Sequence, residues 1–424
     1  MTKHDYDAII VGARCAGAAT AMLLARKGHR VLLVDRARFP SEIPHGHFIH
    51  RDGPPRLARW GLLNRIVASG CPPVTSLTFD LGDFPLSVQN VELDGIAWGY
   101  GPRRGPFDQI LIDAATTAGA ELRQGVAVDS VLMDEKRVVG VSVVGSTRIT
   151  SRLTIGADGK HSRVAQAVKA PTYESVPTLM CWYFSYFRAL PTTSFEIYVV
   201  PGRQAVFVHP TNDSATAVLV GWPIDEFASV RLDLEARFMA ALDLVPSLGQ
   251  RVRSSQRVER IYGTGDMPNF LRKPFGQGWA LVGDAGCHKD PFRALGMSDA
   301  LRDAELLAEA AHQGLSGNEP LESALARYEL QRNEATLPAY HENLHAAQLE
   351  PISPDLLRLR QALRDSPSDT IQFFLARDGR IPSEAFFNAP NLERILGSTR
   401  PSPGNGSISG SVEVRPSVRS AAPG

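Results

Sequence analysis

Acidic residues that directly follow short apolar runs are the side chains of this sequence with the clearest chemical potential. Asp35 follows Val31–Val34, and the pairs Asp158-Gly159 and Gly283-Asp284 also end apolar stretches. A carboxylate placed like Asp35 accepts hydrogen bonds from an adenosine ribose in dinucleotide-binding folds. Glycine beside a carboxylate permits a close backbone approach to a ligand. These positions indicate a nucleotide site at the ends of buried strands.

The residues before Asp35 must position it, and they have the order of a strand, a turn, a helix and a second strand. Ala8–Val11 and Val31–Val34 have the length and β-branched content of buried strands, and residues 16–27 have a helical pattern. The start of such a helix offers free N–H groups to a pyrophosphate. The unit predicts dinucleotide binding; the alternative is an ordinary buried βαβ unit without a ligand.

The turn between this strand and helix reads G-x-R-x-x-G, in which an arginine replaces the usual middle glycine. Gly12 allows the tight turn, and Gly17 lets the helix pack closely on the strand. A side chain at Arg14 crowds the backbone approach to phosphate, although its guanidinium can also contact phosphate. Two arrangements therefore stay open: Arg14 touches the diphosphate, or it is displaced from it.

Two later segments repeat the pattern of a strand that ends at a helix. Asp158-Gly159 leads to a helix that begins near Ser162, and Gly283-Asp284 leads through a loop rich in proline and glycine to a long helix from about Gly296. Arg103 and Arg104 precede a further helix, where they meet a diphosphate or form a solvated basic turn.

A histidine-rich loop and an aromatic region add further candidates. His45, His47 and His50 lack the carboxylate or cysteine partners of a closed metal site, so we expect a polar loop near the ligand and no metal. Residues 172 to about 262 read as a sheet rich in aromatic residues, which is one wall of a pocket for a flat apolar substrate or ordinary sheet packing. The pocket residues predicted from it are Trp182, Phe184, Tyr186, Phe207 and Trp222.

Composition limits the class of protein. The 424 residues include 45 basic and 45 acidic side chains, so no bulk charge points to nucleic acid or an anionic membrane. The four cysteines form no C-x-x-C pair, and the chain begins directly with a strand pattern rather than a signal peptide. No apolar run approaches the roughly 18 residues that span a bilayer. We expect a soluble cytoplasmic protein, as a monomer or homodimer.

Together the three motifs resemble single-component FAD-dependent monooxygenases of the para-hydroxybenzoate hydroxylase type, over about residues 5–345. Their superfamily also contains flavin-dependent halogenases and geranylgeranyl reductases. The resemblance implies an α/β (α+β) fold in which a Rossmann-like FAD-binding βαβ domain is interleaved with a β-sheet substrate domain and followed by C-terminal helices. The expected segments are FAD-binding in 1–75, 102–171 and 271–345, substrate-domain strands in 76–101, the substrate sheet in 172–270, a helical region in 346–396 and a disordered tail in 397–424.

By the same resemblance, Asp35 would hold the adenosine ribose, Arg104 would lie near the diphosphate and Asp284 would bond the ribityl chain. The stretch from Pro291 to Ser298 resembles the family's P-F-x-G-Q-G-M-N loop over the isoalloxazine ring, with Ala294, Leu295 and Ser298 as departures. The complete cofactor set implied is Gly12, Arg14, Gly17, Asp35, Arg36, Arg104, Val128, Asp158, Gly159, Gly283, Asp284, Pro291, Gly296 and Met297.

The resemblance also implies a reaction. NADPH or NADH would bind transiently and reduce FAD, O2 would form a hydroperoxyflavin, and one oxygen atom would hydroxylate or epoxidise an aromatic or polyketide-like small molecule. His288 is the candidate for proton handling, with a structural loop histidine as the alternative, and His45 and His47 are weaker candidates. Other readings are a geranylgeranyl-reductase-like activity and flavin binding without turnover. The W-x-W-x-I-P signature of halogenases is absent.

Overall fold

A computed structural model describes residues 4–43, 46–145 and 147–397. His45 and nearly all of the expected tail therefore lie outside the described residues. None of the helices in the described part of the chain has the length and apolarity that crossing a bilayer requires.

A mainly parallel sheet, with the helices that pack on it, forms one of the two halves of the molecule, called the parallel half below. Its central strands run in the order β9–β2–β1–β12–β22, and each pair in that order is parallel. The apolar runs of β1, β2, β12 and β22 are buried, as expected for parallel strands covered on both faces. The strands of this sheet are β1 (Tyr6–Val11), β2 (Val31–Asp35), β9 (Glu121–Gln124), β10 (Val128–Asp134), β11 (Arg137–Val143), β12 (Thr147–Gly156), β21 (Phe275–Gly276) and β22 (Trp279–Leu281).

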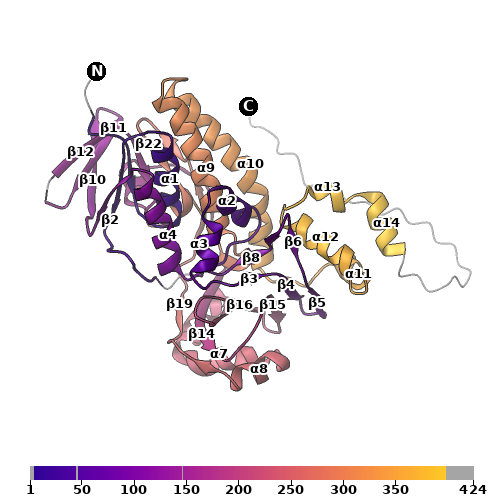
Figure 1. The fold of residues 1–424 in the computed structure, drawn as a ribbon. Coiled ribbons are helices and arrows are strands. Elements are labelled where there is room, and N and C mark those ends of the chain that lie inside the picture. The colour runs from indigo at the N-terminus through magenta and orange to yellow at the C-terminus, as the bar shows by residue number, and fades with distance from the viewer. Residues whose placement is uncertain (1–3, 44–45, 146, 398–424) are drawn as a thin grey trace, which may run out of the picture.

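Alanine-rich helices pack on this sheet and on one another (Figure 1). Small side chains along α1 let it approach both the strands and its neighbouring helices α4 and α9. The helices of this half are α1 (Cys15–Arg26), α2 (Gly53–Arg59), α3 (Leu63–Ala68), α4 (Arg104–Thr117), α5 (Arg163–Ala167), α9 (Gly296–Leu315) and α10 (Leu321–Ala347).

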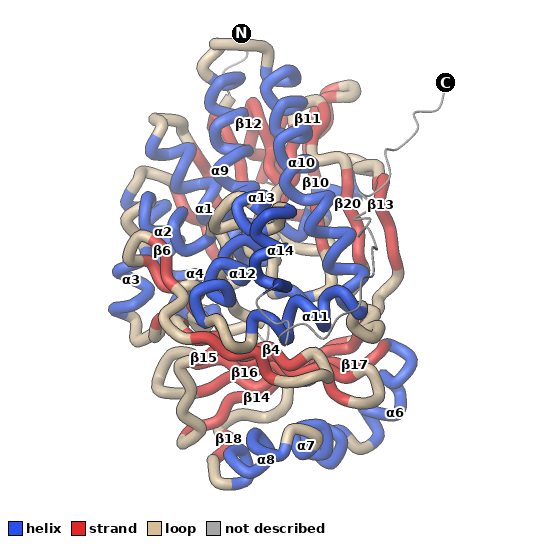
Figure 2. Tube along the Cα trace, turned by 90° about the vertical axis from the view of Figure 1, so that its right-hand side faces the viewer, coloured by secondary structure: helices blue, strands red, loops and turns tan. Residues whose placement is uncertain are grey.

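A second, mostly antiparallel sheet lies below the parallel half in Figure 2. Two distant parts of the chain form it: β4 pairs with β15 although more than a hundred residues separate them in sequence, and β5 pairs with β4 at the edge of the sheet. Its strands are β4 (Ser76–Asp80), β5 (Pro85–Val88), β14 (Met180–Arg188), β15 (Ser194–Val200), β16 (Gln204–Pro210), β17 (Thr216–Pro223), β18 (Gln256–Arg257) and β19 (Tyr262–Thr264).

Helices cover both faces of this second sheet. One face packs against α6 (Phe227–Leu232), α7 (Leu234–Asp243) and α8 (Pro246–Arg253). The sequence predicts a single helix over 230–244, whereas the backbone breaks at Asp233 with φ −142° and ψ 57°. Part of the other face packs against the C-terminal helices, which are α11 (Pro354–Leu363), α12 (Pro367–Arg377), α13 (Ser383–Phe386) and α14 (Ala389–Gly397).

Short segments connect the two halves. Three of them form a small sheet, in which β20 pairs with both β13 and β23. The single-turn segments η2 and η3 follow β22 and β23 and lead into α9. The short elements are β3 (Pro73–Val74), β6 (Glu92–Leu93), β7 (Ile96–Ala97), β8 (Gly99–Tyr100), β13 (Thr172–Val176), β20 (Asn269–Arg272), β23 (Cys287–His288), η1 (Ile224–Glu226), η2 (Gly283–Ala285) and η3 (Pro291–Arg293).

Candidate active site

The parallel sheet brings the three sequence motifs to one edge. Val11 is in register with Val34 of β2 and with Gly156 of β12, and Gly156 is in register with Leu281 of β22. The residues that follow these strands therefore emerge side by side at the carboxyl ends, where open α/β sheets bind ligands. Motifs separated by more than a hundred residues thus meet in one place.

Three glycines permit the close packing at this edge. Gly12 has φ +105°, and a Cβ there would lie 2.4 Å from the carbonyl oxygen of Ala157. A Cβ on Gly17 would lie only 1.8 Å from the Gly12 carbonyl oxygen. Gly283 has φ +62°, and its added Cβ would lie 2.7 Å from that of Ala16. Larger residues would push the helix away from the strands.

Two backbone N–H groups hold the Asp35 side chain, one in the turn after β1 and one just after β2. Its carboxylate accepts hydrogen bonds from the N–H groups of Ala13 and Ala37, each at 2.7 Å. Arg36 beside it is exposed. The carboxylate is only partly buried, so it keeps the access that a ribose ligand needs.

Arg14 is the last residue of the first turn, directly before α1. Its side chain lies against Phe39, with the guanidinium carbon 5.2 Å from the ring centroid. Its Nη1 donates to the Asp108 carboxylate at 2.9 Å and to the Ser41 carbonyl at 3.2 Å. The guanidinium thus has protein partners of its own.

Asp108 joins Arg14 to a second arginine. The carboxylate of Asp108 is fully buried, and it also accepts hydrogen bonds from Nη2 of Arg104 at 3.1 and 3.2 Å. Burial alone would lower the pKa of Arg104, but Asp108 together with other nearby groups outweighs burial and the pKa is raised. Two cations share one carboxylate, and Nε of Arg104 is buried without a partner among the described residues. An anion such as a diphosphate would supply an acceptor for this Nε.

The neighbouring arginine is directed to the other half of the molecule. Arg103 forms an ion pair with Glu259 at 2.8 Å and lies over the ring of Tyr186, 4.0 Å from its centroid. The expectation of a solvated basic turn is therefore wrong for Arg104, which is buried, and Arg103 is only partly exposed. The side chains of Arg103 and Arg104 point in different directions because both residues lie at the start of α4, where successive residues face different sides of the helix.

The two other motif carboxylates also have unused oxygen atoms. Asp158 accepts a hydrogen bond from the N–H of Arg163 at 2.7 Å through Oδ2, whereas its buried Oδ1 has no partner in the described part of the chain. Burial raises the pKa of Asp158. Arg163 in turn donates to the carbonyl of Val128, which places that residue beside the turn at Gly159.

Asp284 lies in η2, which follows strand β22 of the parallel sheet. Its charge acts on Arg104, Cys15 and His288, so the carboxylate lies near these groups. No hydrogen bond from the described residues reaches the Asp284 side chain. Carboxylates and arginine N–H groups without protein partners are the groups that a polar ligand with hydroxyls and phosphates would bind.

The loop Pro291–Gly296 runs from η3 to the start of α9. Ala294 adopts the left-handed conformation with φ 52° and ψ 30°, which favours glycine. An added Cβ on Gly296 would meet no heavy atom within 4 Å, so space is open beside the first turn of α9. Met297 is buried below it, and Ser298 ties the helix to the His50 backbone through a hydrogen bond at 2.7 Å.

The conformation of Ala294 leads to a prediction. Ala294→Gly is expected to raise the free energy of unfolding by up to about 1 kcal/mol, because relief of the left-handed strain exceeds the cost of the extra conformational entropy that glycine gives the unfolded chain. Ala335→Gly, on the exposed face of α10, is the control and is expected to cost about 1 kcal/mol. Urea denaturation compares them, and equal losses in both variants would refute strain at Ala294.

His288, the predicted proton-handling residue, is buried in β23. Its Nδ1 pairs with the carbonyl of Pro268, and its ring stacks on Phe270 with centroids 5.8 Å apart. Burial lowers the pKa of His288, so the ring is neutral near pH 7. One nitrogen therefore has a structural partner and the other stays a candidate for proton transfer.

Four of the five predicted pocket residues share one face of the antiparallel sheet. Trp182, Phe184 and Tyr186 alternate along β14, and the ring of Phe207 packs at a tilt against Trp182 with centroids 5.0 Å apart. Trp222 is a correction to the predicted set. It packs against Tyr183 on the opposite face, in the core beneath α7 and α8, because its register places it one residue out of phase.

His47 links this face to the parallel half. Its Nε2 accepts a hydrogen bond from the Tyr186 hydroxyl at 2.8 Å, and its Nδ1 donates to the Gly101 carbonyl at 3.2 Å. Burial and the nearby His209 lower the pKa of His47 well below its usual value, so the ring is neutral. His50 instead contacts Asp378 and the Arg293 carbonyl. Among the described residues, which omit His45, no cluster suited to a metal ion occurs.

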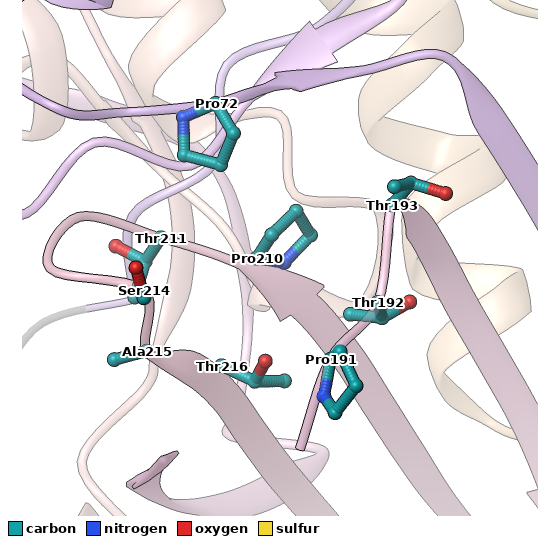
Figure 3. Close-up of a pocket in the computed structure, with 9 residues that line it drawn as sticks. All are labelled: Pro72, Pro191, Thr192, Thr193, Pro210, Thr211, Ser214, Ala215 and Thr216. Carbon is teal, nitrogen blue, oxygen red and sulfur yellow. The ribbon is translucent and has the colours of Figure 1, made fainter. Parts of the chain in front are cut away.

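Two open pockets lie away from these residues. The one in Figure 3 has a volume of about 520 Å³ at the ends of the sheet strands, and none of the five predicted substrate residues lines it. Thr211 on its wall donates to the same Gly101 carbonyl that pairs with His47. A second pocket of about 550 Å³ lies on the far face, beside Tyr183 and Phe227. The four aromatic residues Trp182, Phe184, Tyr186 and Phe207, called the aromatic wall below, are themselves buried and closely packed.

Sequence reasoning missed Asp108, Asp290 and Glu259 as site residues. The spacing of four between Arg104 and Asp108 is a signal that could have found the first. Asp290 and Glu259 act through long-range contacts, to Trp182 and Arg103 respectively, which no local pattern marks.

A family model described as "FAD binding domain" matches residues 5–338. The chain therefore belongs to this family of FAD-dependent oxidoreductases, and the resemblance to enzymes of the para-hydroxybenzoate hydroxylase type is confirmed. The glycine cradle and the unpaired polar groups described above fit FAD.

Curated relatives cover most of the chain at low identity. A 1H-pyrrole-2-carbonyl-[peptidyl-carrier protein] chlorinase of Pseudomonas fluorescens is 23% identical over 78% of this chain and 80% of its own. Digeranylgeranylglycerophospholipid reductase 1 of Methanococcoides burtonii is 27% identical over 77% of this chain and 79% of its own. The family thus contains enzymes with different reactions.

Solved structures establish the fold. The myxobacterial chondrochloren halogenase CndH superposes with a TM-score of 0.74 at 21% identity, over 93% of this chain and 97% of its own. PqsL of Pseudomonas aeruginosa, described as a probable FAD-dependent monooxygenase, superposes with a TM-score of 0.69 at 20% identity, over 89% and 100%. The predicted α/β fold with an FAD-binding domain is confirmed.

Proposed function

We propose that this enzyme is a single-component monooxygenase that uses FAD, NADPH or NADH and O2 to hydroxylate or epoxidise an aromatic or polyketide-like small molecule. One observation carries the proposal. Phe292, within the Pro291–Gly296 loop, packs against Trp182 and Phe207, with centroids 6.4 and 5.6 Å apart. The aromatic wall therefore lies directly beside the loop that covers the isoalloxazine ring in this family.

The residues at the sheet edge would hold the cofactor. Asp35 would accept hydrogen bonds from the ribose, Arg104 with Arg14 would balance the diphosphate, and Asp284 would bind the ribityl hydroxyls. FAD supplies the redox chemistry when bound. The start of α9, a helix of 20 residues, would present its positive dipole end to negative charge on the ring.

The chain's own contribution to the reaction is orientation and exclusion of water. Trp182, Phe207 and Phe292 are each less than 10% exposed, so an apolar ring held against this face would be shielded from solvent. The neutral pair of His47 and Tyr186 lies at the other end of the same face and can hold a proton near a substrate hydroxyl. We propose that the nicotinamide nucleotide binds transiently, because one dinucleotide-binding unit serves FAD.

Two other reactions follow from the relatives. The reductase relative supports reduction of a carbon–carbon double bond, and the chlorinase relative supports halogenation, although this chain lacks the W-x-W-x-I-P signature. A flavin-binding protein without turnover is the alternative of a different class, since Ala294, Leu295 and Ser298 depart from the family loop.

The proposal predicts a yellow protein that NADPH or NADH reduces without oxygen. After O2 is admitted with a panel of phenols and polyketide-like aromatics, we expect a product heavier by one oxygen atom, detected by mass spectrometry. Phe207→Leu, on the substrate face, is expected to lower the ratio of product to peroxide several-fold, whereas Tyr183→Phe on the opposite face is not. Monooxygenation would be rejected if the enzyme formed only peroxide with every aromatic tested and instead reduced an isoprenoid, or chlorinated a substrate when chloride was added.

A further inference from the structure

Asp290 occupies the junction between the aromatic wall and the Pro291–Gly296 loop. Its backbone N–H donates to Oδ1 of Asn269 at 2.7 Å, and its carbonyl accepts from Nδ2 of Asn343 at 2.9 Å. Both asparagines are fully buried and come from β20 and α10. Asn343 also accepts the N–H of Arg293 at 3.0 Å. The position of Asp290 is therefore fixed independently of its side chain.

The two carboxyl oxygens of Asp290 have different surroundings. Oδ1 accepts hydrogen bonds from Nε1 of Trp182 at 3.1 Å and from the N–H of Phe292 at 3.0 Å. Oδ2 is buried and has no partner among the described residues. The residue is only 1% exposed. An ionised carboxylate with one bare oxygen in such a place is costly, whereas a proton on that oxygen removes the charge.

Charged groups near Asp290 are directed elsewhere. On its own segment, Lys289 pairs with Asp299, Arg293 pairs with Glu342, and His288 Nδ1 pairs with a backbone carbonyl. Cys181, on the neighbouring strand β14, belongs to the cluster on the opposite face.

The elements packed around Asp290 bring no cation that bonds to it. Arg272 of β20 lies over Phe270 and donates to the Ala285 carbonyl, and Tyr340 of α10 packs against Leu271 and Cys287. Among the described residues, no cation forms an ion pair with the Asp290 carboxyl group. Burial is accordingly the main cause that raises the pKa of Asp290 to about 7.

We propose that Asp290 is a positioning residue that carries a proton on Oδ2 while Oδ1 joins the Trp182 indole to the backbone of Phe292, so that the aromatic wall and the loop form one proton-dependent unit. Loss of the proton places an unbalanced charge between them. This inference concerns the folded protein and holds whichever reaction the enzyme performs.

The sign of the pH effect follows from linkage. The folded pKa of about 7 is above the usual aspartate pKa of 3.8, so the folded protein binds the proton more tightly than the unfolded chain. Stability from this group is greatest at low pH and falls as pH rises between these two values, by up to roughly tenfold in the folding constant per pH unit. Above about pH 7 the contribution levels off.

Three proteins test the proposal, each purified with FAD bound. In the wild type, infrared difference spectra are expected to show a buried carboxylic acid band that disappears near pH 7. Asp290→Asn keeps the shape of the side chain and is expected to lack that band. Trp182→Phe removes one donor to the ionised form, so its transition is expected to move upward by roughly half to one pH unit.

Stability provides the second measurement. Relative to Asp290→Asn, the wild type is expected to lose at least about tenfold in its folding constant between pH 5 and pH 7 in urea denaturation. A band that persists in Asp290→Asn, or a midpoint unchanged in Trp182→Phe, would overturn the proposal. An ordinary structural carboxylate, ionised throughout, would give neither the band nor the pH-dependent difference. None of these readouts needs a substrate, so they are separate from the test of monooxygenation.

Discussion

An Arg104→Ala variant is expected to bind FAD roughly tenfold to a hundredfold more weakly than the wild type, because it loses a buried charge-assisted contact to the diphosphate. Arg104 is 8% exposed, shares Asp108 with Arg14, and keeps a buried Nε without a partner among the described residues. The measurement is titration of the apoprotein with FAD, followed by quenching of flavin fluorescence.

The adjacent arginine is the matched control. Arg103 has the same charge and lies one residue away, but it pairs with Glu259 and stacks on Tyr186. Arg103→Ala is expected to leave FAD affinity within about twofold of the wild type. Equal losses in the two variants would show that general positive charge, and not the direction of Arg104, governs binding. Unchanged affinity in Arg104→Ala would remove its assigned role.

Gly17→Ala is expected to destabilise the protein by more than about 3 kcal/mol, since overpacking against a backbone atom cannot be relieved by a rotamer change. The added Cβ would lie 1.8 Å from the Gly12 carbonyl oxygen and 3.0 Å from Cβ of Ala157. The first helix must then move away from the sheet edge, so loss of bound FAD is expected together with a lower melting temperature.

Gly46→Ala is the control for this effect. Its added Cβ would have only Cδ2 of Leu219 nearby, at 3.9 Å, which is ordinary contact. We expect its melting temperature and flavin content to stay close to those of the wild type. A Gly17→Ala protein that melts like Gly46→Ala would contradict the tight packing of α1 on β1.

Local patterns predicted the strands and helices that carry the motifs. The strand before Gly12 begins two residues earlier than expected and ends at Val11 as expected, and the long helix begins at the expected Gly296. Buried parallel strands read as continuous apolar runs, and a helix start is marked by glycine and proline, so both leave local signals. One difference is the expected helix over 230–244, because a break at a single residue leaves no periodic signal.

Side-chain direction was beyond the reach of the sequence. The neighbours Arg103 and Arg104 look alike in the sequence, yet one faces the aromatic sheet and the other the FAD-binding half. Trp222 resembles the other aromatic residues of its region but lies on the opposite face, because a shift of one residue in a strand reverses the direction of the side chain. The segment boundaries and the role of His288 stay predictions.

The sequence by itself determined the class of protein: three motifs in a fixed order define an FAD-binding α/β enzyme, because each motif is a local backbone solution to holding a dinucleotide. Only the tertiary structure decided which groups meet. Pairing of β1, β12 and β22 brings the motifs together. Packing of the two halves brings Trp182 to Asp290, which also accepts a hydrogen bond from the N–H of Phe292 on its own segment. Such contacts depend on strand register and on long-range packing, which no window of sequence contains.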